Sequence, residues 1–156
     1  MLPTLPIPSV KNIIIADDDW DDQILFKEAV DNHQYAPFIQ VFSSGNKLIK
    51  ALESGPLPDL IVLDLNMPNK NGIECLQEIR SNPRQKNIPI VIFTTSKDIR
   101  DIELCYIHGA QLFFSKPHTF ELLKNMVHYM ISIDWLNFPK KTDKDLFIEI
   151  ATKGLY

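Results

Sequence analysis

The chain has few of the residues on which the common nucleotide and metal motifs depend. Its 156 residues include 5 glycines, 2 cysteines and 4 histidines. The glycines form neither G-x-G-x-x-G nor G-x-x-x-x-G-K-[ST], so nucleotide binding of either type is disfavoured. Cys75 and Cys105 lie far apart with no CxxC pair, and the histidines are scattered, so we expect no histidine or cysteine metal site. Two buried free thiols in a reducing compartment are expected instead, which places the protein in the cytoplasm.

The chain also lacks an excess of positive charge and a long apolar run. Its net charge is -4, whereas nucleic-acid binding normally needs clustered lysine and arginine, so no nucleic-acid partner is expected. Neither an apolar run of membrane-spanning length nor a basic, apolar leader is present, so no membrane association is expected. The length suits one domain, and a hydrophobic content of 45% is enough for a globular core.

Short apolar runs alternate with helical patterns along most of the chain. Strands are expected at residues 11–16, 38–42, 60–64, 89–94 and 112–114, and helices near 20–32, 47–52, 72–82, 98–108 and 120–135. Continuous apolar runs are typical of strands covered on both faces, and parallel neighbours need a crossover helix. The sequence therefore predicts the α/β class, with a doubly wound five-stranded parallel sheet and helices on both faces.

The ends of the chain differ in composition from this repeating part. Residues 1–9 contain three prolines and are expected to form an extended lead-in to a domain at residues 10–136. Residues 137–156 form a tail, in which the apolar spacing of residues 143–152 favours a short amphipathic helix. A tail of this length is too short for a DNA-binding or enzymatic domain.

Polar side chains follow four of the predicted strands. They are Asp17 and Asp18 after the first strand, Asp64 and Asn66 after the third, Thr94 after the fourth and Lys116 after the fifth. The carboxyl ends of parallel strands meet at one edge, where open α/β sheets bind ligands. Clustered carboxylates repel one another unless a cation lies among them, and Mg²⁺ prefers such oxygen ligands. A lysine ammonium and a threonine hydroxyl can both contact a phosphoryl oxygen. The set indicates a site that places a phosphoryl group on a carboxylate.

Not every acidic residue near the first strand is assigned to this site. Carboxylates favour the amino end of a helix, where they cap free amides and face the positive end of the helix dipole. We interpret Asp19, Asp21 and Asp22 in this way and assign only Asp17 and Asp18 to the metal.

Together these motifs resemble the receiver domain of two-component response regulators. The resemblance rests on I-I-A-D-D-D at 14–19, L-I-V-L-D-L-N-M-P at 60–68 followed by Gly72, I-F-T-T at 92–95 and S-K-P at 115–117. The motifs occur in order and at the family spacing over about residues 10–135. The resemblance implies that Asp64 accepts the phosphoryl group. It also implies that Asp18, Asp64 and the carbonyl of Asn66 bind Mg²⁺ directly, with Asp17 acting mainly through a metal-bound water.

The resemblance further implies a switch. Thr94 would turn toward the phosphoryl group, Phe113 would turn inward, and Lys116 would contact the phosphoryl oxygens beside a cis Lys116–Pro117 bond. The surface formed by the fourth helix, fifth strand and fifth helix would then be read by a partner. The chain is similar to single-domain regulators paired with phytochrome kinases. We therefore expect a sensor histidine kinase as donor, a protein as downstream target, and a homodimer through the helix at 120–135.

Two alternative functions remain to be weighed. A metal-dependent phosphohydrolase that forms a phosphoaspartate normally has a second aspartate two positions after the nucleophile, but that position is Asn66. A receiver-like protein with a purely structural role would be expected to lack Asp18, Asp64 or Lys116, and all three are present. We therefore expect a phospho-accepting signalling module rather than an enzyme with an external substrate.

Overall fold

A computed structural model describes residues 9–154, so the predicted lead-in at residues 1–9 lies, except for Ser9, outside the described part. The strands are β1 (Asn12–Ala16), β2 (Phe38–Phe42), β3 (Leu60–Leu63), β4 (Ile90–Thr94) and β5 (Leu112–Ser115). The helices are α1 (Trp20–Asp31), α2 (Gly45–Ser54), α3 (Gly72–Ser81), α4 (Ile99–Ile107), α5 (Phe120–Ser132) and α6 (Lys144–Lys153). Within residues 9–154, no helix is both long and apolar enough to cross a membrane.

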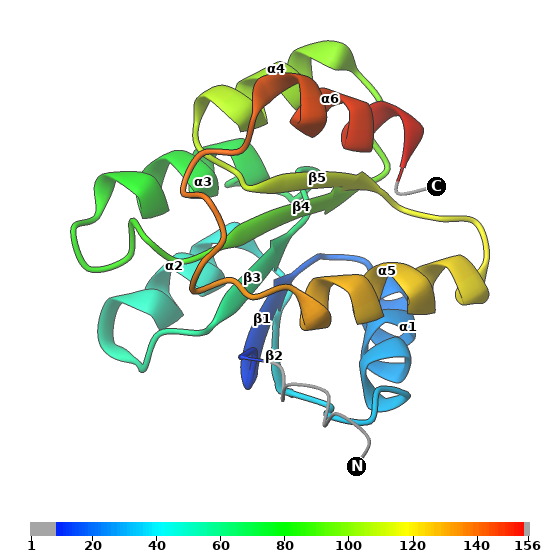
Figure 1. Cartoon of the computed structure of the whole chain (residues 1–156). Coiled ribbons are helices and arrows are strands. Elements are labelled where there is room, and N and C mark those ends of the chain that lie inside the picture. The colour runs from blue at the N-terminus through cyan, green and yellow to red at the C-terminus, as the bar shows by residue number, and fades with distance from the viewer. Residues whose placement is uncertain (1–8, 155–156) are drawn as a thin grey trace.

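The strands form one parallel sheet in the order β2-β1-β3-β4-β5, with helices on both faces (Figure 1). Alternate residues of β1 point to opposite faces: Ile13 and Ile15 pack with residues of α1 and α5, whereas Ile14 packs with residues of α2, α3 and α4. β3 and β4 are buried along their whole length, which explains their continuous apolar runs. The predicted doubly wound fold is confirmed.

Most helices begin at the capping residues that the sequence contains. Asp19 caps α1 by accepting a hydrogen bond from the Asp22 amide, and Asn71 forms a capping box with Glu74 at α3. Helix α2 begins a half-turn earlier than predicted, because Ser44 caps it by accepting from the Lys47 amide. These caps satisfy amide groups that the first turn of a helix leaves free.

Helix α5 is shorter than the predicted 120–135. It ends at Ser132 because Ile133 has an extended backbone, with φ -66° and ψ 135°. Trp135 then folds back, and its indole Nε1–H donates to the Met130 carbonyl at 2.8 Å. This bond satisfies one of the carbonyls that a helix end leaves free. Trp135 is consequently buried rather than presented on the helix surface.

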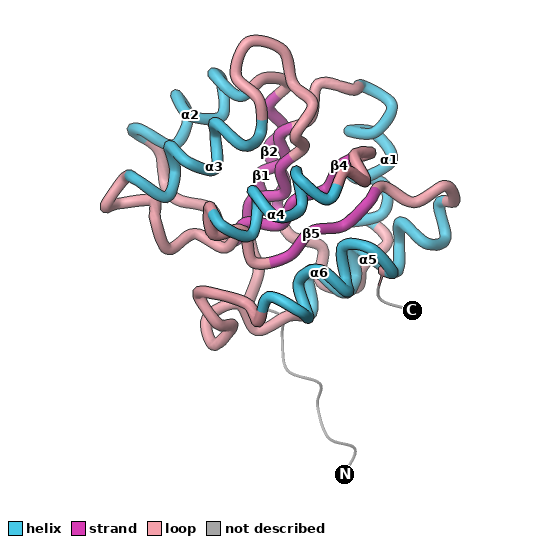
Figure 2. Tube along the Cα trace, turned by 90° about the horizontal axis from the view of Figure 1, so that it is seen from above, coloured by secondary structure: helices cyan, strands magenta, loops and turns pink. Residues whose placement is uncertain are grey.

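The tail forms α6 where the sequence favours a short amphipathic helix. α6 lies against the edge strand β5 and against α4 (Figures 1 and 2). Phe147 packs in the core cluster that includes α4 residues, whereas Ile150 joins the cluster that includes α5 residues. Just before the helix, the Thr142 hydroxyl donates to the Gln111 carbonyl at 2.5 Å. α6 therefore covers an edge that would otherwise be open to another strand.

Candidate functional site

The predicted polar residues meet at the carboxyl edge of the sheet, and backbone hydrogen bonds fix three of them. The Asp17 amide donates to the Phe42 carbonyl at 3.0 Å, and the Asp64 amide donates to the Ala16 carbonyl at 2.9 Å. The Lys116 amide donates to the Thr94 carbonyl at 2.8 Å. Each of these bonds continues the strand pairing one step beyond the strand, so the side chains start from rigid positions.

Three carboxylates form a tight cluster there. Asp17, Asp18 and Asp64 each offer an oxygen, and these oxygens lie within 4.8 Å of one another. Asp17 and Asp64 are only 3% and 5% exposed, whereas Asp18 is exposed. Burial raises the pKa of Asp17 to about 6, even though its bonds with Lys116 and the Asp19 amide oppose this. A group of this kind favours a hard divalent cation, because the cation would replace the repulsion with attraction.

Asn66 lies beside this cluster and joins it to the threonine. The backbone N–H of Asn66 donates to Asp64 Oδ1 at 3.3 Å, and its side-chain Nδ2 donates to Thr94 Oγ1 at 3.5 Å. Asn66 and Asp18 also line one open hollow of about 460 Å³. The structure thus brings Asn66 to the place where a metal ligand is predicted.

Lys116 lies among the carboxylates as the internal counter-charge. Its Nζ is 2.8 Å from Asp17 and 3.0 Å from Asp64. Burial by itself would lower the pKa of Lys116, but the hydrogen bonds with Asp17 and Asp22 and the charge of Asp64 raise it above the usual lysine value. Lys116 is therefore held as an ammonium at the position where it could meet a phosphoryl oxygen.

The interpretation of Asp22 as a helix N-terminal charge is confirmed but incomplete. Asp22 does lie in the first turn of α1, but its carboxylate is 2.7 Å from Lys116 Nζ. The local sequence gives no sign of this contact, because it depends on the angle at which α1 leaves the sheet. The interpretation holds for Asp19, whose side chain caps α1.

The expected cis bond at Lys116–Pro117 is also wrong, since no cis peptide bond occurs in residues 9–154. The bond is trans, the form that X–Pro bonds favour by about 0.5–1 kcal/mol. The Lys116 ammonium reaches the carboxylates from this backbone.

Thr94 and Phe113, the two predicted switch residues, are both fully buried but lie on different strands. Thr94 is fully buried, and its hydroxyl oxygen accepts only long contacts, from Asn66 and from the Ser96 amide at 3.4 Å. Phe113 lies in the middle of β5, away from the carboxylates, and its ring centre is 6.5 Å from that of Phe147 on α6. Phe113 is already fully buried under α6, which the sequence alone does not indicate.

Gly72 allows the segment after β3 to fold tightly beside Asp64. Its amide donates to the Leu65 carbonyl at 3.0 Å. A Cβ at this position would collide with the Asp64 backbone carbonyl. Any larger residue would therefore push α3 away from the strand that carries Asp64.

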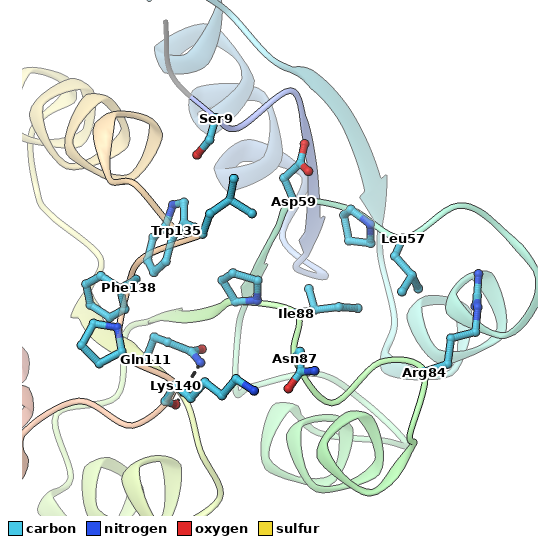
Figure 3. A pocket seen from close by; sticks show the side chains of 14 residues that line it. Ser9, Leu57, Asp59, Arg84, Asn87, Ile88, Gln111, Trp135, Phe138 and Lys140 are labelled. Carbon is cyan, nitrogen blue, oxygen red and sulfur yellow. Dashed lines mark hydrogen bonds between the residues drawn. The ribbon is translucent and has the colours of Figure 1, made fainter. Parts of the chain in front are cut away.

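The structure also has a cavity of about 410 Å³ at the opposite edge of the sheet (Figure 3). It lies near the amino ends of the strands, between Asp59, Ile88, Trp135 and Phe138. None of the predicted phosphoryl or metal residues lines it. The chemistry indicated by the sequence is thus confined to the carboxyl edge.

Comparisons with known proteins agree with this geometry. Residues 13–128 match the response regulator receiver domain family. Response regulator Rcp1 from Synechocystis sp. is 40% identical over 84 residues, which cover 54% of this chain and 56% of Rcp1. In this match the chain therefore spans little more than half of that relative.

Two solved structures extend the comparison to the whole fold. The phosphorylated cyanobacterial phytochrome response regulator RcpA has a TM-score of 0.76 and 30% identity, covering 84% of this chain and 97% of RcpA. The Mn²⁺-bound form of Rcp1 has a TM-score of 0.73 and 31% identity, covering 83% of this chain and 96% of Rcp1. The acidic cluster thus corresponds to the pocket in which receiver domains bind a divalent metal. The phosphohydrolase alternative is not favoured, and the chain belongs to the response regulator receiver domain family of two-component signalling proteins.

Proposed function

We propose that this protein is a single-domain response regulator that accepts a phosphoryl group on Asp64 from a sensor histidine kinase. The observation that carries the proposal is the position of the Asp64 carboxylate. It is buried, it shares a 4.8 Å cluster with two other carboxylates, and it lies 3.0 Å from the Lys116 ammonium. Asp17 shares these features, but it follows β1, whereas Asp64 follows β3, the middle strand of the sheet.

The transfer is an in-line displacement at phosphorus. An Asp64 carboxylate oxygen forms the new P–O bond while the bond from phosphorus to the donor nitrogen breaks, and the electron pair of that bond stays on the donor imidazole. Lys116, whose side chain is nearly buried, offsets charge on the phosphoryl oxygens. Asp17, Asp18, Asp64 and Asn66 would hold Mg²⁺, which would supply further positive charge at the phosphoryl group. Water later hydrolyses the acyl phosphate, so the protein turns over only its own phosphoryl group.

The contacts of Thr94 and Phe113 support a role for these two residues in reporting this change. The contacts of the Thr94 hydroxyl are long, so little energy is lost when it turns toward a phosphoryl oxygen. Phe113 can then move toward the space that Thr94 leaves. Such a local charge change biases a two-state element, as in other signalling switches.

Helix α6 limits where a downstream protein can read the switch. The Phe147 ring centre lies 5.3 Å from that of Tyr106 on α4, and Lys141 Nζ lies 5.3 Å from the same Tyr106 ring. These contacts place α6 over the α4 and β5 surface that the family resemblance implies as the output face. A partner protein that reads β5 directly must therefore displace α6.

We also propose that the protein forms a homodimer through α5 and the residues just after it. The support is an exposed apolar set on this segment: Leu122, Tyr129 and Leu136, the last being 86% exposed. Because Trp135 is buried, the informative change is Leu136→Ser, with Leu146→Ser on the exposed face of α6 as the matched control. Light scattering should show weaker self-association for Leu136→Ser alone. A monomeric mass for the unmodified protein at high concentration would contradict the dimer.

The phosphorylation itself is tested by mixing the full chain with Mg²⁺ and phosphoramidate or a phosphorylated histidine kinase. Intact mass spectrometry should show the addition of one phosphoryl group. A phosphohydrolase would instead release phosphate from excess phosphomonoester over many turnovers, which we do not expect. Phosphotransfer profiling against candidate kinases would then identify the donor.

A further inference from the structure

Asp22 is a fourth carboxylate at the site, and it differs from the other three in its origin. It comes from the first turn of α1 rather than from a strand end. Its carboxylate is 2.7 Å from Lys116 Nζ, compared with 2.8 Å for Asp17 and 3.0 Å for Asp64. The ammonium thus donates hydrogen bonds to Asp22 and Asp64 and forms an ion pair with Asp17.

Asp22 lies outside the carboxylate cluster that suits a cation. That cluster contains Asp17, Asp18 and Asp64, and its oxygens lie within 4.8 Å of one another. A divalent cation in the cluster would compete with Lys116 for the oxygens of Asp17 and Asp64. Of the four carboxylates, Asp22 would then be the one that contacts Lys116 and does not contact the cation.

We infer that Asp22 is a positioning residue that holds the Lys116 ammonium on the α1 side of the pocket. This inference rests on the proposed phosphoryl transfer to Asp64. Asp22 and Asp64 keep two of the ammonium donors, and the third, which now faces Asp17, is released for an incoming phosphoryl oxygen. Without Asp22, the flexible lysine side chain loses the partner that does not also serve the metal, and its ammonium is left with Asp17 and Asp64 alone.

Asp21 provides a matched control for the simpler explanation that Asp22 only favours the helix dipole. Both residues lie in the first turn of α1 and carry the same charge, so replacing either with asparagine changes the helix end in the same way. Asp21 is exposed, and no ion pair of Asp21 occurs among the described residues. Only Asp22 reaches Lys116.

The test compares the full-length Asp22→Asn, Asp21→Asn and Asp22→Glu variants with the unmodified protein. Phosphorylation by phosphoramidate, followed by intact mass, should be roughly tenfold slower in Asp22→Asn, because misplacing a catalytic group by an ångström or less has effects of this size. Asp21→Asn should react at nearly the unmodified rate, and Asp22→Glu should recover most of the loss.

A second measurement needs no phosphodonor. Calorimetric titration with Mn²⁺ should show weaker binding to Asp22→Asn than to Asp21→Asn, because a released Lys116 competes with the cation for Asp17 and Asp64. Equal behaviour of the two asparagine variants in both measurements would overturn the inference and leave the proposed function intact. An unmodified protein that gains no phosphoryl group would overturn the proposed function, and this inference with it.

Discussion

The carboxyl end of strand β5 and the face of β5 beside α4 differ in the kind of contact that they make. At its carboxyl end, Lys116 meets carboxylates that lie at or next to strand ends or helix starts, and the contacts are ion pairs of 2.7 to 3.0 Å. On its α4 side, Phe113 meets Phe147, which comes from a helix more than thirty residues later and touches it only through apolar packing. Apart from Asp22 on α1, the carboxylates of the first region follow strands of the sheet. The second region depends on the path of the tail, which brings α6 back to β5.

Removal of divalent cations should have the largest effect, and it should act on the acidic pocket alone. With a chelator present, phosphorylation by phosphoramidate should be lost, because uncompensated carboxylates repel the anionic donor. The rate should return when Mg²⁺ is added in excess, and the urea midpoint of the chelated protein should show that the fold and α6 remain in place. Phosphorylation at an undiminished rate in the chelator would contradict the metal assignment.

Truncating Phe113 and Phe147, whose rings meet edge to face, compares a side chain of the sheet with one of the tail. Phe113→Ala should destabilise the domain by about 3–5 kcal/mol, the usual loss for a fully buried phenylalanine. Phe147 is equally buried. Phe147→Ala should nevertheless destabilise the domain less than Phe113→Ala, because α6 can detach once its docking becomes unfavourable. Urea unfolding gives both values.

Leu146→Ala is the control for this pair, since Leu146 is exposed on α6 and should change stability by no more than about 0.5 kcal/mol. Hydrogen exchange of residues 144–153 should accelerate in Phe147→Ala while β5 stays protected. If Phe147→Ala and Phe113→Ala were equally destabilising, α6 would be an integral part of the cooperative domain.

The sequence predicts the sheet and most of the pocket because their signals are local. Each central strand is a continuous apolar run, and each polar residue of the pocket stands at the end of its own run. The position of Gly72 can also be predicted from the local sequence, because it lies at the start of a helix close to Asp64. Such features need only the rule that parallel strands share a carboxyl edge.

The features that the sequence does not predict depend on angles and on distant packing. Asp22 reaches Lys116 because of the direction of α1, and Phe113 meets Phe147 because α6 returns to β5. Trp135 continues a helical pattern, yet the chain leaves the helix after Ser132, and the indole bonds to the Met130 carbonyl. In each case a tertiary contact overrides a locally reasonable interpretation.

The most direct test of the central claim is the intact mass of three full-length proteins after incubation with Mg²⁺ and phosphoramidate. The unmodified protein and the Asp21→Asn control should each gain one phosphoryl group, whereas Asp64→Asn should gain none. Circular dichroism would show that Asp64→Asn remains folded. If Asp64→Asn still gained a phosphoryl group at the same rate, Asp64 would not be the acceptor and the account of the pocket would be wrong.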